Sequence, residues 1–220
     1  MFTDIHTHKS KSSNDCISIL NLLHTDSIAN DLALSNNFSI GIHPRFIRVE
    51  SLQEDIRIIQ FHAKKKNVLA IGECGLDRLS DTQFELQISI FEDMVRLSEE
   101  IKKPLIIHCV KAYDDIRILH KKIKPKQPWI LHGFNVKISV AKQMLEQGFY
   151  FSFGDAILNN DSMATLAFPS IPDGKFFLET DASQVSINTI FARAAILRNT
   201  SELSLKSQLH QQFLKLFHHV

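Results

Sequence analysis

Residues 67–77 read NVLAIGECGLD, an apolar, strand-forming run that reaches a carboxylate at Glu73, with glycines at positions 72 and 75. The same arrangement, a short apolar run followed by a possible metal ligand, recurs along the whole chain. A carboxylate buried among apolar residues costs folding free energy unless it is paired or bound to a metal. Only a closed parallel barrel brings the C-terminal ends of distant strands to one point, and enzymes of that fold carry their active sites there. The six candidate ligands in such positions are His6, His8, Glu73, His108, His132 and Asp181.

Apolar runs of strand length alternate with segments whose apolar residues recur at helical spacing. One such segment places Phe84, Ile88, Phe91 and Val95 on one side of a predicted helix. Nearly all-apolar strands that alternate with helices indicate a parallel sheet covered on both faces. We therefore expect an α/β fold of the (β/α)8 TIM-barrel class, formed by a single domain over residues 1–220. The eight predicted strands are Met1–His6, Cys16–Leu22, Phe38–Ile42, Asn67–Glu73, Pro104–Cys109, Pro128–His132, Phe149–Phe153 and Lys175–Thr180.

The first crossover is too short for the usual pattern. About seven residues, Lys9–Asp15, separate the first two predicted strands, whereas a βαβ crossover usually needs about 10–12 or more. We therefore expect a trimmed barrel that lacks its first crossover helix. Either a bare loop covers that flank or the second strand is displaced from the barrel. At the other end of the chain, Leu203–Leu216 predicts a final amphipathic helix that covers the barrel surface.

The composition is that of an ordinary globular protein, with 44% hydrophobic and 22% charged residues. A formal net charge of +1 predicts no strong field from the whole molecule, so an anionic substrate must be held by a local cluster. The first residues lack the features of a secretory signal, and no apolar run approaches the roughly 20 residues needed to span a bilayer. An odd count of three cysteines argues against a disulfide framework. We expect a cytoplasmic protein with reduced thiols, no membrane association and no obligate protein partner.

The candidate ligands have the geometry that chelation requires. His6 and His8 are two residues apart, so on a strand both imidazoles face the same side. Glu73 carries two oxygens and could bridge two cations, which a single imidazole nitrogen cannot do. Asp181 follows the last strand and could bind a metal, orient the attacking water and accept its proton. Mixed imidazole and carboxylate ligands suit Zn²⁺, Mn²⁺ or Mg²⁺ and do not distinguish among them.

Basic residues also follow the predicted strand ends, where each would belong to a loop on the catalytic face. Together they would focus positive potential on the mouth of a nearly neutral protein, which favours DNA or another phosphate-bearing substrate over a neutral amide. His43, in the motif GIHPR, lies in the same region and is a candidate substrate contact, whereas Asp77 is expected to stabilise its loop. The candidate phosphate contacts are Arg45, Arg78 and Lys111, and the other basic residues in this set are Lys9, Lys11, Arg48 and Lys137.

Taken together, these motifs resemble the TatD-type metal-dependent deoxyribonucleases, a branch of the amidohydrolase-like TIM barrels. The resemblance runs through His-x-His, GIHP, GECGLD, PLIIHC, LHGF and LETD, in the family's order and over nearly the whole chain. It implies metal-dependent hydrolysis of DNA phosphodiesters, often from the 3′ end, with Asp181 and Glu73 as catalytic residues. It also implies two divalent ions bridged by Glu73. The first ion would be held by His6, His8, Glu73 and Asp181, and the second by Glu73, His108 and His132.

Several positions depart from the family's pattern. Val110 and Lys111 stand where members commonly carry Arg-Asp, and Arg78 stands where they often carry Tyr after the GLD motif. The family's longer loop after the final Asp is missing, because Ala182–Ser186 runs directly into a predicted helix. The metal ligands are thus retained while the residues around the substrate are altered, which supports a metal-dependent hydrolase more firmly than a deoxyribonuclease.

Three functions are compatible with these residues. The leading hypothesis is a two-metal phosphodiesterase that acts on DNA. The second is a hydrolase of a small phosphate ester or a cyclic amide on the same metal centre, because the loops that could grip a longer substrate are missing. The third is a non-catalytic barrel that keeps the site for metal-dependent binding, and the retention of all six ligands argues against it.

Overall fold

The computed structural model describes residues 1–9, 15–23 and 37–217. The chain divides into two compact units, the first containing Met1–Leu20 and Ile130–His219 and the second containing Asn21–Trp129. The single domain predicted over residues 1–220 stays a prediction.

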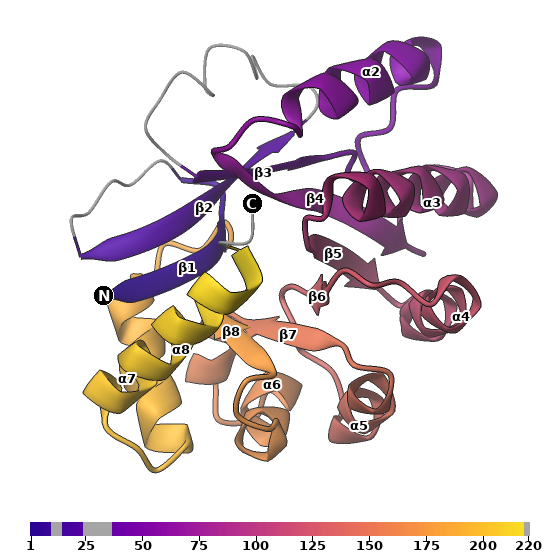
Figure 1. The fold of residues 1–220 in the computed structure, drawn as a ribbon. Helices are drawn as coiled ribbons and strands as arrows, with labels where there is room; N and C mark the ends of the chain where they lie inside the picture. Colours follow the sequence, from indigo (N-terminus) through magenta and orange to yellow (C-terminus); the bar gives the residue numbers. More distant parts are fainter. Residues whose placement is uncertain (10–14, 24–36, 218–220) are drawn as a thin grey trace. The chain divides into compact units, whose positions relative to one another are not determined.

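The described residues contain eight β-strands, and from β3 onward each strand is followed by at least one helix, in agreement with the sequence pattern there (Figure 1). The strands are hydrogen-bonded in the order β1 to β8, and each described pair of neighbouring strands is parallel. This order of parallel strands and intervening helices is that of the (β/α)8 TIM-barrel class, which confirms the predicted fold. The strands are β1 (Phe2–Thr7), β2 (Cys16–Leu23), β3 (Asn37–Gly41), β4 (Val68–Asp77), β5 (Leu105–Val110), β6 (Trp129–Leu131), β7 (Tyr150–Phe153) and β8 (Phe176–Leu178).

Helices follow most of these strands, and three of the helices in the described residues are short 3₁₀ turns. The α-helices are α2 (Leu52–His62), α3 (Phe84–Ile101), α4 (Tyr113–Ile123), α5 (Ile138–Glu146), α6 (Met163–Ala167), α7 (Ile187–Leu197) and α8 (Glu202–Phe217). The 3₁₀ helices are η1 (Val49–Ser51), η2 (Asp155–Leu158) and η3 (Phe168–Ser170). Of the helices in the described part of the chain, none is long and apolar enough to cross a membrane.

In the first unit, the two C-terminal helices pack beside β1 (Figure 1). Phe2 of β1 meets Phe191 of α7 edge to face, with ring centroids 5.1 Å apart. On α8, the side-chain amide of Gln212 donates to the backbone oxygen of Phe176 in β8 at 2.9 Å. The predicted final amphipathic helix is therefore confirmed, and it covers strands of this unit.

The ends of the first and last strands meet within this unit. Beyond β8 the chain continues beside β1, with a parallel bridge between Thr7 and Asp181. The backbone N–H of Asp181 donates to the oxygen of His6 at 2.9 Å, and the N–H of His8 donates to the oxygen of Asp181 at 3.2 Å. Backbone hydrogen bonds alone therefore bring three of the predicted ligands together.

In the second unit, β4 lies between β3 and β5, and α3 packs against β4. A buried cation ties the start of β5 to the segment before β4. The ammonium of Lys103, which is 1% exposed, donates to the backbone oxygens of Ala63, Lys65 and Val68 at 2.7, 2.9 and 2.6 Å. Burial lowers the pKa of Lys103 to about 8. The three carbonyl groups give this buried amine the partners that it would otherwise lack.

Two sequence-based expectations about the strands are wrong. β2 pairs in parallel with β1, with Cys16 opposite Phe2, so the alternative in which the second strand is displaced does not hold. β4 does not end at Glu73, because an irregularity in its pairing with β5 after Ile71 lets the strand continue to Asp77. The predicted absence of a first crossover helix falls on residues 10–14, which lie outside the described residues.

The cysteines are free thiols, as the odd count predicted. Cys74 and Cys109 are buried, and burial raises the pKa of both thiols. Cys16 is partly exposed, and burial raises its pKa to about 12. All three therefore stay protonated at neutral pH, which makes them poor metal ligands.

Candidate metal centre

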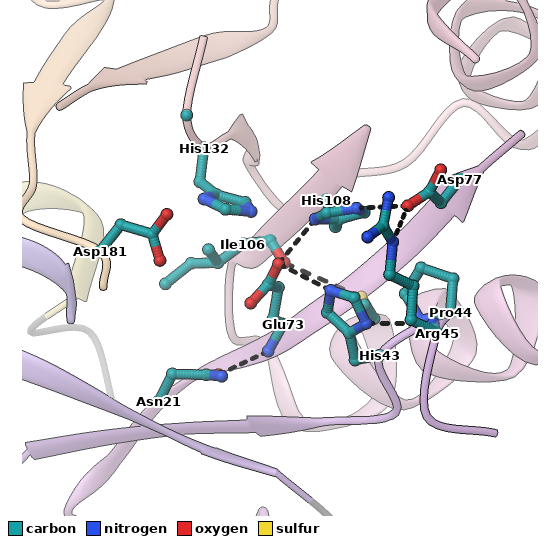
Figure 2. Close-up of polar contacts among 12 residues, drawn as sticks. Asn21, His43, Pro44, Arg45, Glu73, Asp77, Ile106, His108, His132 and Asp181 are labelled. Atoms are coloured by element: carbon teal, nitrogen blue, oxygen red, sulfur yellow. Dashed lines mark hydrogen bonds and ion pairs between the residues drawn. The ribbon is translucent and has the colours of Figure 1, made fainter. Parts of the chain in front are cut away.

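In the second unit, His43, Glu73 and His108 form a compact cluster (Figure 2). Glu73 lies in β4 and is 4% exposed. Its Oε1 lies 3.1 Å from Nε2 of His43 and 2.8 Å from Nδ1 of His108. The backbone N–H of Glu73 donates to Oδ1 of Asn21 at 2.7 Å, which anchors the strand at this residue. Three adjacent strands, β3, β4 and β5, thus carry or directly precede one group of possible ligands.

The glycines on either side of Glu73 are required by the close approach of β5. A Cβ at Gly72, whose φ is +151°, would lie 2.5 Å from the backbone oxygen of Ile106. A Cβ at Gly75, whose φ is +147°, would lie 2.0 Å from the backbone oxygen of His108. Neither position has room or a suitable backbone conformation for an L side chain. The glycines therefore allow β4 to carry Glu73 beside His108.

Asp77, at the end of β4, holds the other nitrogen of His108. Its Oδ2 lies 3.2 Å from Nε2 of His108 and also accepts a hydrogen bond from Nε of Arg45, while its Oδ1 accepts from the backbone N–H of Leu79 at 2.8 Å. Burial alone would raise the pKa of Asp77, but these donors hold it below its usual value, so the carboxylate is ionised at neutral pH. Because Nε2 of His108 points to Asp77, Nδ1 is the nitrogen available to a metal ion. Asp77 stabilises its loop through Leu79, as expected, but its contact with His108 was not predicted.

The protonation of His43 follows from its contact with the backbone. Nδ1 of His43 accepts a hydrogen bond from the backbone N–H of Arg45 at 3.1 Å. An accepting ring nitrogen carries no proton, so the proton is on Nε2, which faces Glu73. Nε2 is then a hydrogen-bond donor and not a metal ligand. This geometry suits a residue that orients Glu73 or donates to a substrate oxygen.

In the first unit, His6, His8 and Asp181 form a second cluster. Nε2 of His6 lies 3.7 Å and Nε2 of His8 lies 3.3 Å from Oδ1 of Asp181. The two imidazoles are close, with ring centroids 5.1 Å apart, which confirms that they face the same side. His6 is fully buried, whereas the side chain of Asp181 is 43% exposed. Asp181 therefore combines contact with two imidazoles and access to solvent.

His132 follows β6 in the same unit, and its ring centroid lies 4.4 Å from that of His6. Nδ1 of His132 lies 3.5 Å from Oε1 of Glu179, a fully buried carboxylate that also accepts from the backbone N–H of Gly133 at 2.7 Å. A carboxylate at Nδ1 leaves Nε2 of His132 available to a metal ion. Sequence reasoning missed Glu179. Alternation could have found it, because Glu179 and Asp181 are two residues apart at the end of one strand.

The donor atoms of the two clusters are spaced as the ligands of a divalent ion are. In each cluster, one candidate atom per residue lies within 4.8 Å of the others. Two ligand atoms about 2.1 Å from a tetrahedral ion lie roughly 3.4 Å apart. The separation of 2.8 Å between Glu73 and His108 in the second unit, and those of 3.3 and 3.7 Å in the first, lie on both sides of this value. The residues therefore fit a divalent metal, while the bridging role of Glu73 stays a prediction.

The two arginines predicted to contact phosphate are paired with carboxylates. Arg45 pairs with the buried Asp77, and Arg78 pairs with Asp115 through two hydrogen bonds of 3.0 and 2.7 Å. The guanidinium of Arg78 also lies 4.0 Å from the ring centroid of Phe84. Both arginine side chains remain 48% exposed, so each keeps N–H groups toward solvent. Their contact with phosphate stays a prediction.

The other predicted basic residues differ in their surroundings. The ammonium of Lys9 donates to a backbone oxygen after β8 at 2.6 Å, and Arg48 pairs with Asp55. Lys111 is exposed and follows the end of β5 with a left-handed backbone, φ +51°. Its side chain is therefore accessible to a phosphate group in solvent. Lys11 lies outside the described residues.

Histidine and carboxylate clusters at the C-terminal ends of parallel barrel strands define a metal-dependent hydrolase of the TIM-barrel class. The family model described as TatD related DNase matches residues 5–217. The chain therefore belongs to this family, which confirms the resemblance seen in its motifs.

Relatives of known sequence or structure agree with this assignment. An uncharacterized metal-dependent hydrolase of Buchnera aphidicola subsp. Baizongia pistaciae is 31% identical over 196 residues, which cover 81% of this chain and 73% of that protein. The human 3'-5' RNA nuclease TATDN2 is 33% identical over 150 residues, which cover 66% of this chain and 20% of that protein. The solved structure of YJJV, a TatD homolog from Escherichia coli K12, matches with a TM-score of 0.85 and 21% identity. That match covers 99% of this chain and 98% of the other, which supports the fold.

Proposed function

We propose that the chain hydrolyses phosphodiester bonds in DNA with the help of bound divalent ions. The observation that carries the proposal is the pair of imidazole–carboxylate clusters, one in each unit, whose donor atoms already have ligand spacing. Family membership adds support, since the matching model is that of TatD related DNases and a human relative is a nuclease. A nucleic-acid backbone is the substrate class that these two share.

The ligands follow from the side-chain geometry. In the first unit, His6, His8 and Asp181 would hold one ion, with His132 as a further ligand through Nε2. In the second unit, Glu73 and Nδ1 of His108 would hold another. The chemistry that divalent ions supply when bound is polarisation of a phosphoryl oxygen and stabilisation of the charge that develops on the attacking and leaving oxygens.

Asp181 is the candidate general base. Its side chain is 43% exposed, and it lines a cavity of about 230 Å³ together with Gly133, Gly154 and Glu179. Water can therefore reach its oxygens, and a carboxylate so placed can orient a water molecule and accept its proton. Glu73 is enclosed, at 4% exposure, and its main role is to hold metal.

Four residues of the second unit are the proposed substrate contacts. The Nε2–H of His43 faces Glu73 and would donate to a phosphate oxygen when Glu73 holds metal, and the backbone contact of Nδ1 fixes the ring in the donating form. The exposed N–H groups of Arg45 and Arg78 and the ammonium of Lys111 would make charge-assisted hydrogen bonds to the backbone of a nucleic acid. Such bonds are about twice as strong as neutral ones.

A second candidate function is hydrolysis of a small phosphate ester. The observation that favours it is the short connection after Asp181, because α7 begins at Ile187 with Ser186 as its N-cap. Residues 182–186 form only a short connection, which offers few groups that could bind a long nucleic-acid strand. The same ligands and the same base would serve this reaction.

Turnover of a single-stranded oligonucleotide, labelled at its 3′ or 5′ end, tests the proposal. Protein treated with a chelator should be inactive and should regain cleavage with Mg²⁺, Mn²⁺ or Zn²⁺. Glu73→Gln should lose more than about 100-fold in rate, the upper range for residues that merely support metal ligands. Glu50→Gln, at an exposed position in the same unit, is the matched control and should cleave like the wild type.

The result also separates the two candidates. Cleavage of p-nitrophenyl phosphate as efficient as that of the oligonucleotide would favour the small ester. Metal-loaded protein that cleaves neither substrate would overturn both.

A further inference from the structure

A buried side-chain contact joins β1 to the segment after β8, and the chemistry proposed above does not use it. Asp4 is 5% exposed and points its carboxylate at Thr180. Its Oδ1 accepts from the backbone N–H of Thr180 at 2.9 Å, and its Oδ2 accepts from the Thr180 hydroxyl at 2.6 Å. The Thr180 hydroxyl oxygen also lies 2.9 Å from that of Thr7. These three residues, Asp4, Thr7 and Thr180, form one connected group, which we call the β1–β8 latch.

The latch immediately precedes a strained residue of the metal site. Asp181 has a φ of +50°, in the left-handed region that residues other than glycine rarely adopt. Such a conformation persists only where the surrounding structure determines it. The Asp4 carboxylate holds both the backbone and the side chain of Thr180. It therefore fixes the chain at the residue directly before Asp181. The latch is thus placed to hold the Asp181 carboxylate where the two imidazoles of its cluster meet it.

Packing alone does not account for a carboxylate at position 4. Burial of a charged group costs free energy that an apolar residue would not incur. Asp4 also lines a cavity of about 170 Å³ together with Cys16, Ser18 and Ile187, so it is not needed to fill the space. What distinguishes Asp4 from an apolar residue is its ability to accept two hydrogen bonds from Thr180.

We propose that Asp4 is a positioning residue which, through Thr180, sets the carboxylate of Asp181 relative to His6 and His8. The proposal rests on the proposed binding of a metal ion by these three ligands. Residues that support metal ligands typically change metal affinity by about 10–100-fold when they are removed. Loss of the latch should therefore lower the affinity of the first unit's cluster for its metal ion by that factor. The cluster of the second unit contains no latch residue and should keep its affinity.

Thr180→Val and Thr180→Ser form the test pair. The side chain of valine has the shape of threonine but cannot donate to Oδ2 of Asp4, so only the backbone hydrogen bond to Oδ1 remains, whereas serine keeps the hydroxyl. Mn²⁺ binding to the metal-free, full-length protein is followed by electron paramagnetic resonance, at a temperature at which circular dichroism shows every variant to be folded. We expect one class of Mn²⁺ site to weaken by about 10–100-fold in the valine variant, with the other class unchanged. The serine variant should bind both classes with affinities close to those of the wild type.

Asp4→Ala provides a second measurement that does not depend on the folding of the valine variant. It removes the acceptor next to an existing cavity, leaves Thr180 intact, and should weaken the same class of Mn²⁺ site. Thr200→Val, at an exposed position in the same unit, is the matched control and should bind Mn²⁺ like the wild type.

The possible outcomes separate this inference from the proposed function. Wild-type affinities in both Thr180→Val and Asp4→Ala would overturn the inference and leave the proposed function intact. Three other results would assign the latch to general stability and would also overturn the inference. They are an equal loss of Mn²⁺ affinity at both classes of site, a loss of Mn²⁺ affinity in the serine variant, and unfolding of both test variants. A wild-type protein that binds no Mn²⁺ would overturn the proposed function and the inference with it.

Discussion

Replacement of Asp77 by Asn should disable His108 as a metal ligand through a change of tautomer. The backbone N–H of Leu79, which donates to Oδ1 of Asp77, is fixed in place, whereas the Arg45 side chain that donates to Oδ2 is 48% exposed and can turn to solvent, so the amide oxygen of Asn should take the Oδ1 position. The amide NH₂ then faces Nε2 of His108, where the Oδ2 of Asp77 was the acceptor. Nε2 must now accept, which moves the ring proton to Nδ1, the nitrogen that faces Glu73. The nitrogen needed by a metal ion is thereby blocked.

The size of the effect can be worked from the same contacts. Loss of a supporting carboxylate at a ligand histidine should lower metal affinity by about 10–100-fold, which corresponds to roughly 1.4–2.7 kcal/mol at 25 °C. The effect on folding should be smaller. The lost partner, Arg45, is 48% exposed, so solvent screens its ion pair with Asp77 and the pair contributes little to folding stability. For a chain of 220 residues, we therefore expect the melting temperature to fall by no more than about 4 °C.

The assay combines Mn²⁺ titration with ¹⁵N chemical shifts of the histidine rings, which report which nitrogen carries the proton. Asp93→Asn breaks an Arg–Asp pair on the surface of α3 and serves as the control for loss of an ion pair. An Asp77→Asn protein with wild-type Mn²⁺ affinity and an unchanged His108 tautomer would refute the assignment of Nδ1 as the metal-binding nitrogen.

Three further predictions concern the base, the substrate contacts and the buried lysine. Asp181→Asn should slow hydrolysis far more than it weakens metal binding, because the base is lost while the imidazoles remain; equal losses in rate and affinity would remove its role as base. If the substrate is single-stranded DNA, Lys111→Ala or Arg78→Ala should make the log–log salt slope of binding shallower by roughly 0.7 for a residue that touches one phosphate; an unchanged slope would exclude that contact. The pKa of Lys103, lowered by burial to about 8, means that the unfolded chain binds its proton more tightly, so stability should rise with pH between about 8 and 10.5. Lys103→Met should flatten that rise in urea titrations and lower stability by about 1–3 kcal/mol, because three carbonyl groups lose their donor; an unchanged pH profile would contradict this.

The strands and the metal ligands could be predicted from the sequence because both depend on local pattern. An apolar run of strand length is visible in the sequence, and the residue at its C-terminal end must lie at the same end of a parallel sheet. The clustering of His6 and His8 with Asp181 follows from this rule, whereas Glu73 lies four residues before the end of β4 and still meets His108.

The residues that support the site could not be predicted, because their tertiary contacts produce no regular spacing in the sequence. Arg45 and Asp77 are 32 positions apart, and Arg78 and Asp115 are 37 positions apart, so no periodicity connects them. The continuation of β4 past Glu73 was missed for a similar reason. It depends on how closely β5 approaches Gly72, which is a property of two strands and not of one.

We propose that each of the two imidazole–carboxylate clusters holds a divalent ion. Anomalous X-ray scattering from crystals grown with Mn²⁺ tests it most directly, because it locates the ion without assuming a substrate. We predict one anomalous peak within about 2.3 Å of donor atoms of His6, His8 and Asp181, and another at the same distance from Glu73 and Nδ1 of His108. Crystals that contain Mn²⁺ but show no anomalous peak at either cluster would contradict the account.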